Sequence, residues 1–275
     1  MASCLVGSEM CIRDRNHADL EQVLGQILDH CGCAEAWPVE FNHASSHQLL
    51  ALRIRGKVPP LELVLSGGDG LVATRVILIL DEKADLDLLE VVLAEGGSAH
   101  SHVIEVHLGQ EAELRHGFLA TADGQASLLA HLAVEQAPRS RYAFTSVVTG
   151  WSLGRVEPRV VQLEGQAETT LKGLAMTSAE QQLATHTAVR FDGPEGELDQ
   201  LQKCLASGQS HTIFNGAINV PRVAQRTNAA QLSRNLLLSG QARVDTKPEL
   251  EIVADDVRCA HGATVSQLQE DELFY

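Results

Sequence analysis

The sequence TKPELEIVADDVRCAHGAT, residues 246–264, decides the fold of the C-terminal part of the chain. Side chains of a strand point alternately to its two faces, so Leu250, Ile252 and Ala254 form one row that we expect to be buried. The pair Asp255-Asp256 then indicates a bend. Because the alternation resumes at Val257, the stretch predicts two strands joined by a corner.

The second of these strands carries a thiol and an imidazole on one face. Cys259 and His261 share that face with Val257, and side chains two positions apart in a strand lie about 7 Å apart. Thiolate and imidazole suit zinc, copper and the iron of iron-sulfur clusters. Two ligands do not complete a four-coordinate site, so the others would come from elsewhere in this chain or from a partner. The alternative is a small buried cysteine beside a hydrogen-bonded surface histidine.

From about residue 98 to this stretch, short alternating strands follow one another, separated by turns of Gly, Asp, Asn or Pro. A spacing of roughly ten to fifteen residues is typical of a sandwich, a barrel or a β-helix. Small residues and tight turns favour the β-helix, because stacked coils need compact corners. The expected strands are Val103–Leu108, Glu113–Leu119, Ser127–Val134, Arg141–Val148, Arg159–Leu163, Thr169–Ala175, Leu183–Phe191, Thr212–Val220, Gln231–Leu238 and Glu249–Val253.

One segment of this region has the spacing of a helix. Apolar residues recur at helical intervals after Pro194, and proline suits the first turn of a helix. We therefore expect a short helix over residues 194–206, lying on the strands with Cys204 on its apolar side. The residues that set the spacing are Leu198, Leu201, Cys204 and Leu205.

Residues 16–97 predict a small α/β region. Helical spacing runs from Leu20 to Leu28, and Gly32 is placed to cap that helix. His30, Cys31 and Cys33 can also be read as a metal cluster, but we prefer the helix end. Alternating apolar residues then predict strands over residues 50–55, 61–65 and 72–80.

Residues 1–15 stand apart from the rest. The string LVGSEMCIRDR, residues 5–15, is the translation of a common transposon-based sequencing adapter. We interpret residues 1–15 as this artefact rather than as natural protein, in the way that tags are set aside. The alternative of a signal peptide is not favoured, because Glu9, Arg13 and Asp14 interrupt a short apolar core.

Composition bounds the partners. With 275 residues, 44% of them hydrophobic and 21% charged, the chain can bury a large core. A net charge of -15 argues against nucleic-acid binding, which needs clustered Lys and Arg. The sequence contains no run of eighteen apolar residues, so it predicts no membrane span. The small number of cysteines in a chain of this length fits a reducing compartment. With nucleic acid and membrane set aside, the expected partners are proteins or metal.

Histidines invite a second hypothesis of a metal site. His100 and His102 share a strand face, and His107 and His116 lie on nearby strands. No carboxylate or third histidine stands at a fixed spacing from them, so we expect ordinary polar strand positions instead.

The sequence offers no catalytic constellation. A Gly-x-Ser-x-Gly motif is absent, and Gly56-Lys57 lacks the other residues of a phosphate loop. Asp255 and Asp256 imitate the acid pair of a β-helix enzyme that acts on carbohydrate, the least favoured alternative. Adjacent strand residues point to opposite faces, so we expect this pair to cap a corner.

Five blocks of the sequence together resemble the SufD members of the SufB/SufD family, which are scaffold subunits of iron-sulfur cluster assembly. The blocks are FNGAINV (214–220), QLSRNLLL (231–238), VDTKP with LEI (244–252), ADDVRCAHGATV (254–265) and ELFY (272–275). The resemblance extends more faintly back to about His100, and His186 stands where family members also carry histidine. Two positions depart from the family: Ser266 replaces a usual Gly, and a second histidine is missing near Arg190.

The resemblance implies a mainly β fold, a right-handed parallel β-helix core over residues 98–275 after the small α/β N-terminal remnant. It also implies a non-enzymatic scaffold that pairs with a SufB-like subunit and, through C-terminal helices that we expect to be missing here, with a SufC-like ATPase. Cys259 and His261 match the functional Cys and His of SufD, where iron or a transient nascent Fe-S cluster is held at the partner interface. None is expected to be tightly bound by this chain alone.

The same resemblance sets the remaining expectations. The compartment is the cytoplasm, or the plastid stroma if the source is a photosynthetic eukaryote, with no membrane and no nucleic-acid partner. The nearer alternative is the SufB-like paralogue, which carries a His-Glu-rich segment in place of CAHGATV. We also expect the chain to be an internal fragment of a longer protein.

Overall fold

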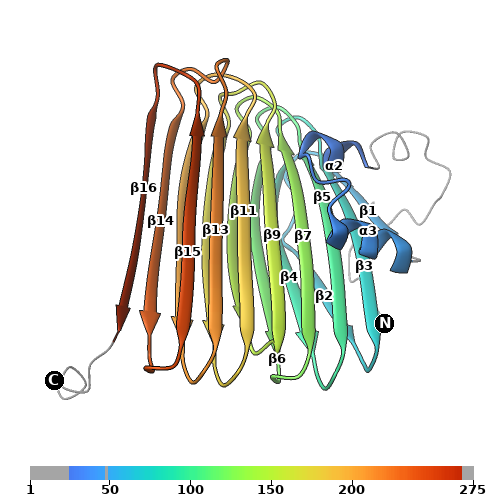
Figure 1. Cartoon of the computed structure of the whole chain (residues 1–275). Helices are drawn as coiled ribbons and strands as arrows, with labels where there is room; N and C mark the ends of the chain where they lie inside the picture. The colour runs from blue at the N-terminus through green and yellow to red at the C-terminus, as the bar shows by residue number, and fades with distance from the viewer. Residues whose placement is uncertain (1–24, 47–48, 268–275) are drawn as a thin grey trace.

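A computed structural model describes residues 25–46 and 49–267 of the chain. The adapter segment expected at residues 1–15 lies outside these residues. Two helices, α2 (Gln26–His30) and α3 (Trp37–Ser45), precede a long series of strands. Figure 1 shows the strands as two facing sheets with both helices against one of them.

The odd-numbered strands form one eight-stranded sheet, called sheet A, and the even-numbered strands form a second, called sheet B. Sheet A consists of β1 (Leu49–Ile54), β3 (Leu71–Leu80), β5 (Ala99–Leu108), β7 (Ser127–Gln136), β9 (Leu153–Gln162), β11 (Gln182–Phe191), β13 (His211–Val220) and β15 (Arg243–Ile252). Sheet B consists of β2 (Leu61–Gly67), β4 (Asp85–Ala94), β6 (Glu113–Ala122), β8 (Arg141–Thr149), β10 (Glu168–Thr177), β12 (Glu197–Ala206), β14 (Asn228–Leu237) and β16 (Arg258–Gln267).

Every strand pairs in parallel with the strand two places along the chain, as β5 does with β3 and β7. The chain therefore winds as a coil in which each turn supplies one strand to each sheet. This confirms the mainly β, parallel β-helix fold predicted from the sequence. The sheets begin at β1, so the strands that precede residue 98 stack in the same two sheets as those that follow it.

The core lies between the sheets and follows the alternation of each strand. In β13 every second residue is buried, which matches the pattern of its sequence HTIFNGAINV. Register places the inward residues of successive coils above one another, so Phe214 stacks between Thr185 and Thr246. Burying an apolar side chain fully stabilises the fold by about 1.5–3 kcal/mol. Each coil therefore depends on the next coil to complete its burial.

The corners that lead from sheet A to sheet B repeat one backbone conformation. Lys83, Glu111, Arg139, Gln166, Glu195 and Arg226 have positive φ in successive corners. The amide of each donates to a carbonyl of the following corner, as Arg139 N does to Gln166 O at 3.1 Å. Exposed side chains continue the ladder, with Arg139 Nη2 3.0 Å from Glu111 Oε1. The backbone bonds fix the register, since exposed ion pairs contribute little.

The two helices lie on the outer face of sheet A, over β3, β5 and β7. Outward-facing Val103 and Ala133 form a small second core with the helical residues Ile27, Leu28 and Val39. Asn42 of α3 anchors the second helix. Its Nδ2 donates to the backbone oxygens of Thr74 and Ser101, at 3.1 and 3.0 Å.

The helix expected over residues 194–206 is wrong. Residues 197–206 form β12, in register with β10 and β14. Leu198 and Cys204 point inward and are 4% and 0% exposed, whereas Leu201 lies half-buried on the outer face. Leu198 and Cys204 are six residues apart, an even number, so both lie on one face of a strand. Hydrogen bonds to the strands on both sides outweigh the local helical pattern.

The strand assignment predicts unequal costs for two leucines that a helix would treat alike. Leu198→Ala leaves a cavity in the core and lowers the free energy of unfolding by about 2–5 kcal/mol. Leu201→Ala, on the outer face of the same strand, costs well under half of that. Chemical denaturation of both variants measures the difference, and equal costs would contradict the strand.

Candidate functional site

Among the described residues, the coil formed by β15 and β16 is the last and has a neighbouring coil on one side only. These strands stand at the ends of their sheets, beyond β13 and β14 respectively. Figure 1 shows β16 as the outermost strand of its sheet. A strand at the end of a sheet presents unpaired N–H and C=O groups, which can pair with another chain.

Cys259 and His261 lie on β16 and continue two inward columns of side chains. Cys259 is in register with Ala229, and His261 with Gln231. Both β14 residues are 2% exposed and so mark the inward direction. Cys259 is half-buried against the core, whereas His261 is exposed, with no further coil over it in the described part of the chain. The two side chains share a face, as the alternation predicted.

Burial raises the pKa of the Cys259 thiol, and a hydrogen bond with the backbone of Ala229 offsets only part of this effect. The thiol form is therefore favoured in the free chain. A soft metal ion can bind the sulfur by displacing its proton, which makes binding depend on pH.

The row expected to be buried on β15 is only partly so. Leu250 and Ile252 are in register with the buried Ile218 and Val220 and therefore point inward. Leu250 is half-buried and Ile252 is 40% exposed, so the expectation is wrong for Ile252, because β15 has no strand beyond it within residues 49–267. Ala254 is 7% exposed, as expected.

The bend expected at Asp255-Asp256 is confirmed as the corner between β15 and β16. The carbonyl oxygen of Asp256 accepts a hydrogen bond from Arg226 N at 2.5 Å. Both aspartates are exposed, and the corner serves the backbone ladder.

Two of the histidines considered as metal ligands meet inside the core at Glu90. His116 Nε2 lies 2.8 Å from one carboxylate oxygen, and His102 Nε2 lies 3.2 Å from the other. Hydroxyls hold the far sides of both rings: Thr74 Oγ1 contacts His102 Nδ1 at 2.8 Å, and Tyr142 OH contacts His116 Nδ1 at 3.1 Å. Burial by itself would raise the pKa of Glu90, but the two imidazoles outweigh it and hold that pKa well below its usual range.

This arrangement pairs a buried charge rather than forming a metal site. Within residues 25–46 and 49–267, no group of three or more His, Cys, Asp or Glu side chains is arranged to hold a metal ion. His100 packs its ring edge-on to Trp151, with 5.6 Å between the ring centroids. Cys259 and His261 likewise find no third ligand in the described part of the chain.

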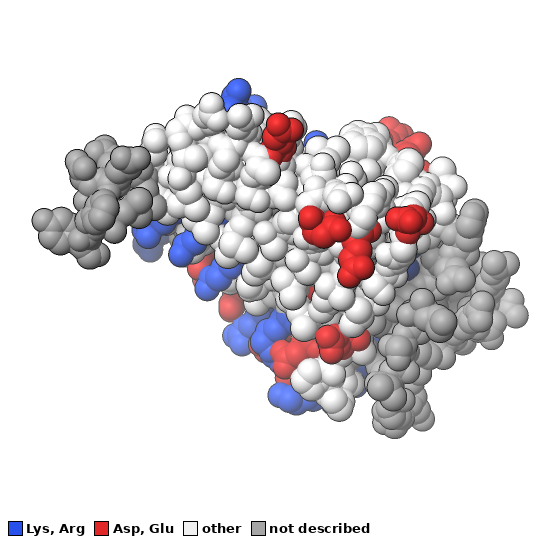
Figure 2. Space-filling view, turned by 90° about the horizontal axis from the view of Figure 1, so that it is seen from below, with Lys and Arg blue, Asp and Glu red and all other residues white. Residues whose placement is uncertain are grey.

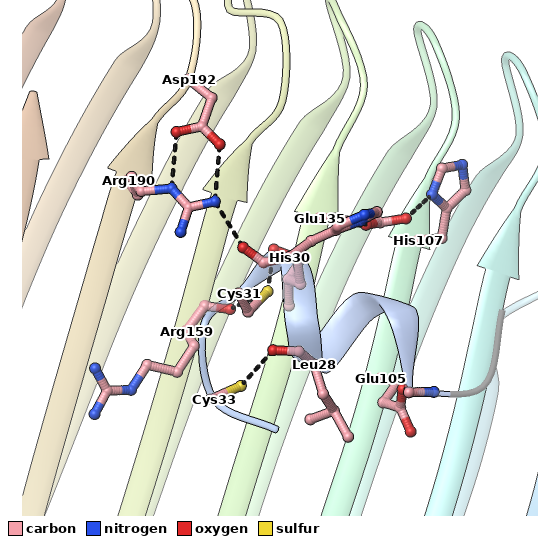
Figure 3. Close-up of polar contacts among 12 residues, drawn as sticks. Leu28, His30, Cys31, Cys33, Glu105, His107, Glu135, Arg159, Arg190 and Asp192 are labelled. Atoms are coloured by element: carbon pink, nitrogen blue, oxygen red, sulfur yellow. Dashed lines mark hydrogen bonds and ion pairs between the residues drawn. The ribbon is translucent and has the colours of Figure 1, made fainter. Parts of the chain in front are cut away.

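The Cys31-Gly32-Cys33 segment is a helix end, as we preferred. Gly32 has a φ of 65°, and Cys33 N donates to Leu28 O at 2.9 Å, which closes the C-terminus of α2. Burial raises the pKa of Cys33 to about 12 and that of Cys31 well above its usual value. Both cysteines are therefore thiols packed against backbone carbonyls (Figure 3).

A carboxylate between two histidines fastens α2 to sheet A. Glu135 of β7 contacts His30 Nδ1 at 2.6 Å and His107 Nδ1 at 2.5 Å, through different oxygens. Arg190 of β11 adds a hydrogen bond from Nη2 to His30 O at 2.7 Å, while Asp192 holds its guanidinium (Figure 3). His107 thus has a structural partner that the sequence did not reveal.

The outer face of sheet A also carries a buried histidine, His131 of β7, which is 1% exposed. Its Nδ1 lies 3.7 Å from Glu157 Oε2, and Glu157 is in turn bound by Arg155 and Arg159. Burial lowers the pKa of His131 to about 4, and the pull of Glu157 in the other direction is weaker. His186 lies half-buried on β11, and burial lowers its pKa too.

Sequence reasoning missed a set of buried amides inside the later coils. Gln200, Gln202 and Gln231 all point inward and are 2–3% exposed. Gln200 and Gln202 stand at the same parity as Leu198 and Cys204. This signal was hidden because the segment resembled a helix.

Charged side chains are unevenly placed on the surface. Figure 2 looks onto one end of the strands, and on this face most Lys and Arg side chains lie along one side, interspersed with Asp and Glu, while further Asp and Glu side chains lie elsewhere. The described part of this face carries no continuous basic surface. In the described residues no helix is long and apolar enough to span a membrane.

The fold and the last coil define a parallel β-helix protein with an uncovered Cys-His strand at one end. Residues 63–275 match the family described as SUF system FeS cluster assembly, SufBD core domain. The chain therefore belongs to the SufBD family of iron-sulfur cluster assembly proteins.

Curated relatives agree with this assignment. The chain is 40% identical over 173 residues to an iron-sulfur cluster assembly SufBD family protein of Synechocystis, covering 63% of this chain and 38% of the relative. It is 38% identical over 205 residues to the chloroplastic protein ABCI7 of Arabidopsis thaliana, covering 73% and 43%. It is 39% identical over 115 residues to the iron-sulfur cluster assembly protein SufD of Escherichia coli, covering 42% and 27%. The chain thus spans less than half the length of these three relatives.

The buried ring of His131 predicts a specific loss of stability in acid. The unfolded chain protonates this ring near pH 6.5, whereas the folded chain does so only near pH 4. The free energy of unfolding therefore falls by up to roughly 3 kcal/mol as the pH drops across this window. Denaturation at several pH values, compared with His131→Asn, isolates the effect because other titrating groups are common to both. Equal pH slopes in the two proteins would contradict it.

Proposed function

We propose that this chain is a SufD-like scaffold subunit whose last coil binds a homologous SufB-like subunit. The interface holds iron or a nascent iron-sulfur cluster as cargo. A SufC-like ATPase acts on the assembled complex, and this chain contributes no catalytic residues of its own. Membership of the SufBD family and the printed names of its relatives support this proposal.

The observation that carries the proposal is the pairing of two soft ligands with an uncovered strand. Cys259 and His261 share the inward face of β16, whose outer edge has no partner strand in the described residues. A partner that covers this coil would bury Ile252 and the half-buried Leu250, which favours association. The same partner would supply the ligands that two side chains lack.

His261 is the principal ligand in this proposal, and Cys259 supports it. His261 is exposed and ready to bind, whereas Cys259 is half-buried and must lose a proton that burial favours. Opening or closing of the interface then completes or releases the site. Because the cargo is held partly by the partner, it need not bind to this chain alone.

The alternatives find less support. The segment CAHGATV stands where a SufB-like paralogue carries His and Glu, so the SufD-like role is favoured. A carbohydrate-acting β-helix enzyme needs two carboxyl groups that converge on one bond. Asp255 and Asp256 instead stand at an exposed corner.

The proposal predicts that His261→Ala removes cargo without dissolving the complex. Iron and acid-labile sulfide are measured in the complex that forms when the protein is co-expressed with SufB-like and SufC-like partners. We expect His261→Ala to lower both at least severalfold and Cys259→Ser to lower them less. Thr264→Ala, on the outer face of the same strand, serves as the matched control and keeps normal content. A normal cluster content in both site variants would place the chemistry on the partner.

A further inference from the structure

A row of buried hydrogen bonds runs through the interior of the last coils. Thr187 of β11, Gln200 of β12 and Gln231 of β14 all point inward and are 6%, 2% and 2% exposed. Gln200 Nε2 donates to Thr187 Oγ1 at 2.6 Å, and Gln231 Nε2 donates to Gln200 Oε1 at 2.9 Å. Gln200 thus donates to the facing strand of its own coil, and Gln231 donates to the preceding coil.

The interior is shaped to hold the last amide. A Cβ at Gly216 of β13 would lie 2.1 Å from Gln231 Nε2, so the amide in its present position occupies space that the glycine leaves open. Gly173 makes room for Gln202 in the same way, with its Cβ position 2.1 Å from Gln202 Oε1. Each of these two amides is therefore packed into space that a side chain at the glycine would fill.

This row of hydrogen bonds ends at Gln231 Oε1, an acceptor that has no donor. Gln231 Oε1 is buried and makes no hydrogen bond within the described residues. Gln231 Nε2 is engaged by Gln200 of β12, and the next residue in register on the other side of Gln231 is His261 of β16. A buried acceptor without a partner is costly, and a ring N–H of His261 is a donor within the same column.

We propose that Gln231 is a positioning residue for His261. Its Oε1 accepts a hydrogen bond from one ring N–H, which fixes the tautomer and leaves the lone pair of the other ring nitrogen available. Histidines that bind metals are generally held through their second nitrogen in this manner. The part of this inference that concerns cargo rests on the proposed function, whereas the orientation of the ring does not.

Another histidine in the same column shows the contrast. His116 occupies the equivalent inward position in β6, and partners hold both of its nitrogens, Tyr142 on one side and Glu90 on the other. It has no nitrogen left for a ligand. His261 stands after the last hydrogen bond of the row, where Gln231 is the partner that the row supplies, on one side of the ring.

The test is the tautomer of His261 in this chain alone, read from the ¹⁵N shifts of its ring at pH 9, where an imidazole is neutral. The His261→Gln variant lacks this ring, so the signals that disappear from its spectrum are assigned to His261. In the native chain we expect one tautomer to dominate. Gln231→Met keeps the volume but removes the acceptor, and we expect the tautomer ratio to change roughly fivefold, the equivalent of one ordinary hydrogen bond. Gln231→Glu retains an acceptor and restores the native preference.

Gln202→Met is the matched control. Gln202 is also buried, but its column leads to Ser233 and Ala263 rather than to His261. An unchanged ratio in folded Gln231→Met, or an equal change in Gln202→Met, would overturn the proposal. Thermal unfolding of each variant shows that the chain is folded.

A second readout separates this inference from the proposed function. In the complex with SufB-like and SufC-like partners, we expect Gln231→Met to lower iron content severalfold and Gln231→Glu to recover part of it. If His261→Ala keeps normal iron while the tautomer still responds to Gln231, the orientation stands and the cargo role fails. If the tautomer does not respond, the positioning role fails whatever the iron content.

Discussion

Parallel pairing between strands one coil apart makes every coil of this protein depend on the next. The inward side chains of β13 are covered by those of β11 and β15, and the same relation runs through both sheets. Backbone hydrogen bonds between successive corners hold the coils at a fixed register. Because register determines which side chains stack, a change in one coil alters the surroundings of two others.

Stacked columns allow polar groups inside a core that is largely apolar. Glu90 is tolerated because an imidazole of the same sheet and one from the facing sheet meet its two oxygens. Gln200 is tolerated because Thr187 and Gln231 satisfy its amide from opposite sides. Such groups stabilise one register over others, since a shift of a single coil would leave a buried charge or amide without its partner.

Among the described residues, this mutual cover ends at the coil of β15 and β16, where we propose that the cargo is held. Cys259 and His261 occupy positions that are buried in all the strands of sheet B from β4 to β14. The positions that carry structural residues in the interior therefore carry a half-buried thiol and an exposed imidazole at this end. The thiol of Cys259 packs against the core and is half-buried, whereas the imidazole of His261 is exposed.

The sequence by itself determined the local features. Alternation predicted most strands, Gly32 predicted the end of α2, and the spacing of Cys259 and His261 predicted their shared face. Only the tertiary structure decided that residues 197–206 form a strand, that Ile252 is exposed, and that His102 and His116 meet at Glu90. The physical reason is the range of the interactions. Face and period depend on neighbouring residues, whereas burial and partners depend on a coil that lies 31 residues away, as for Gln200 and Gln231.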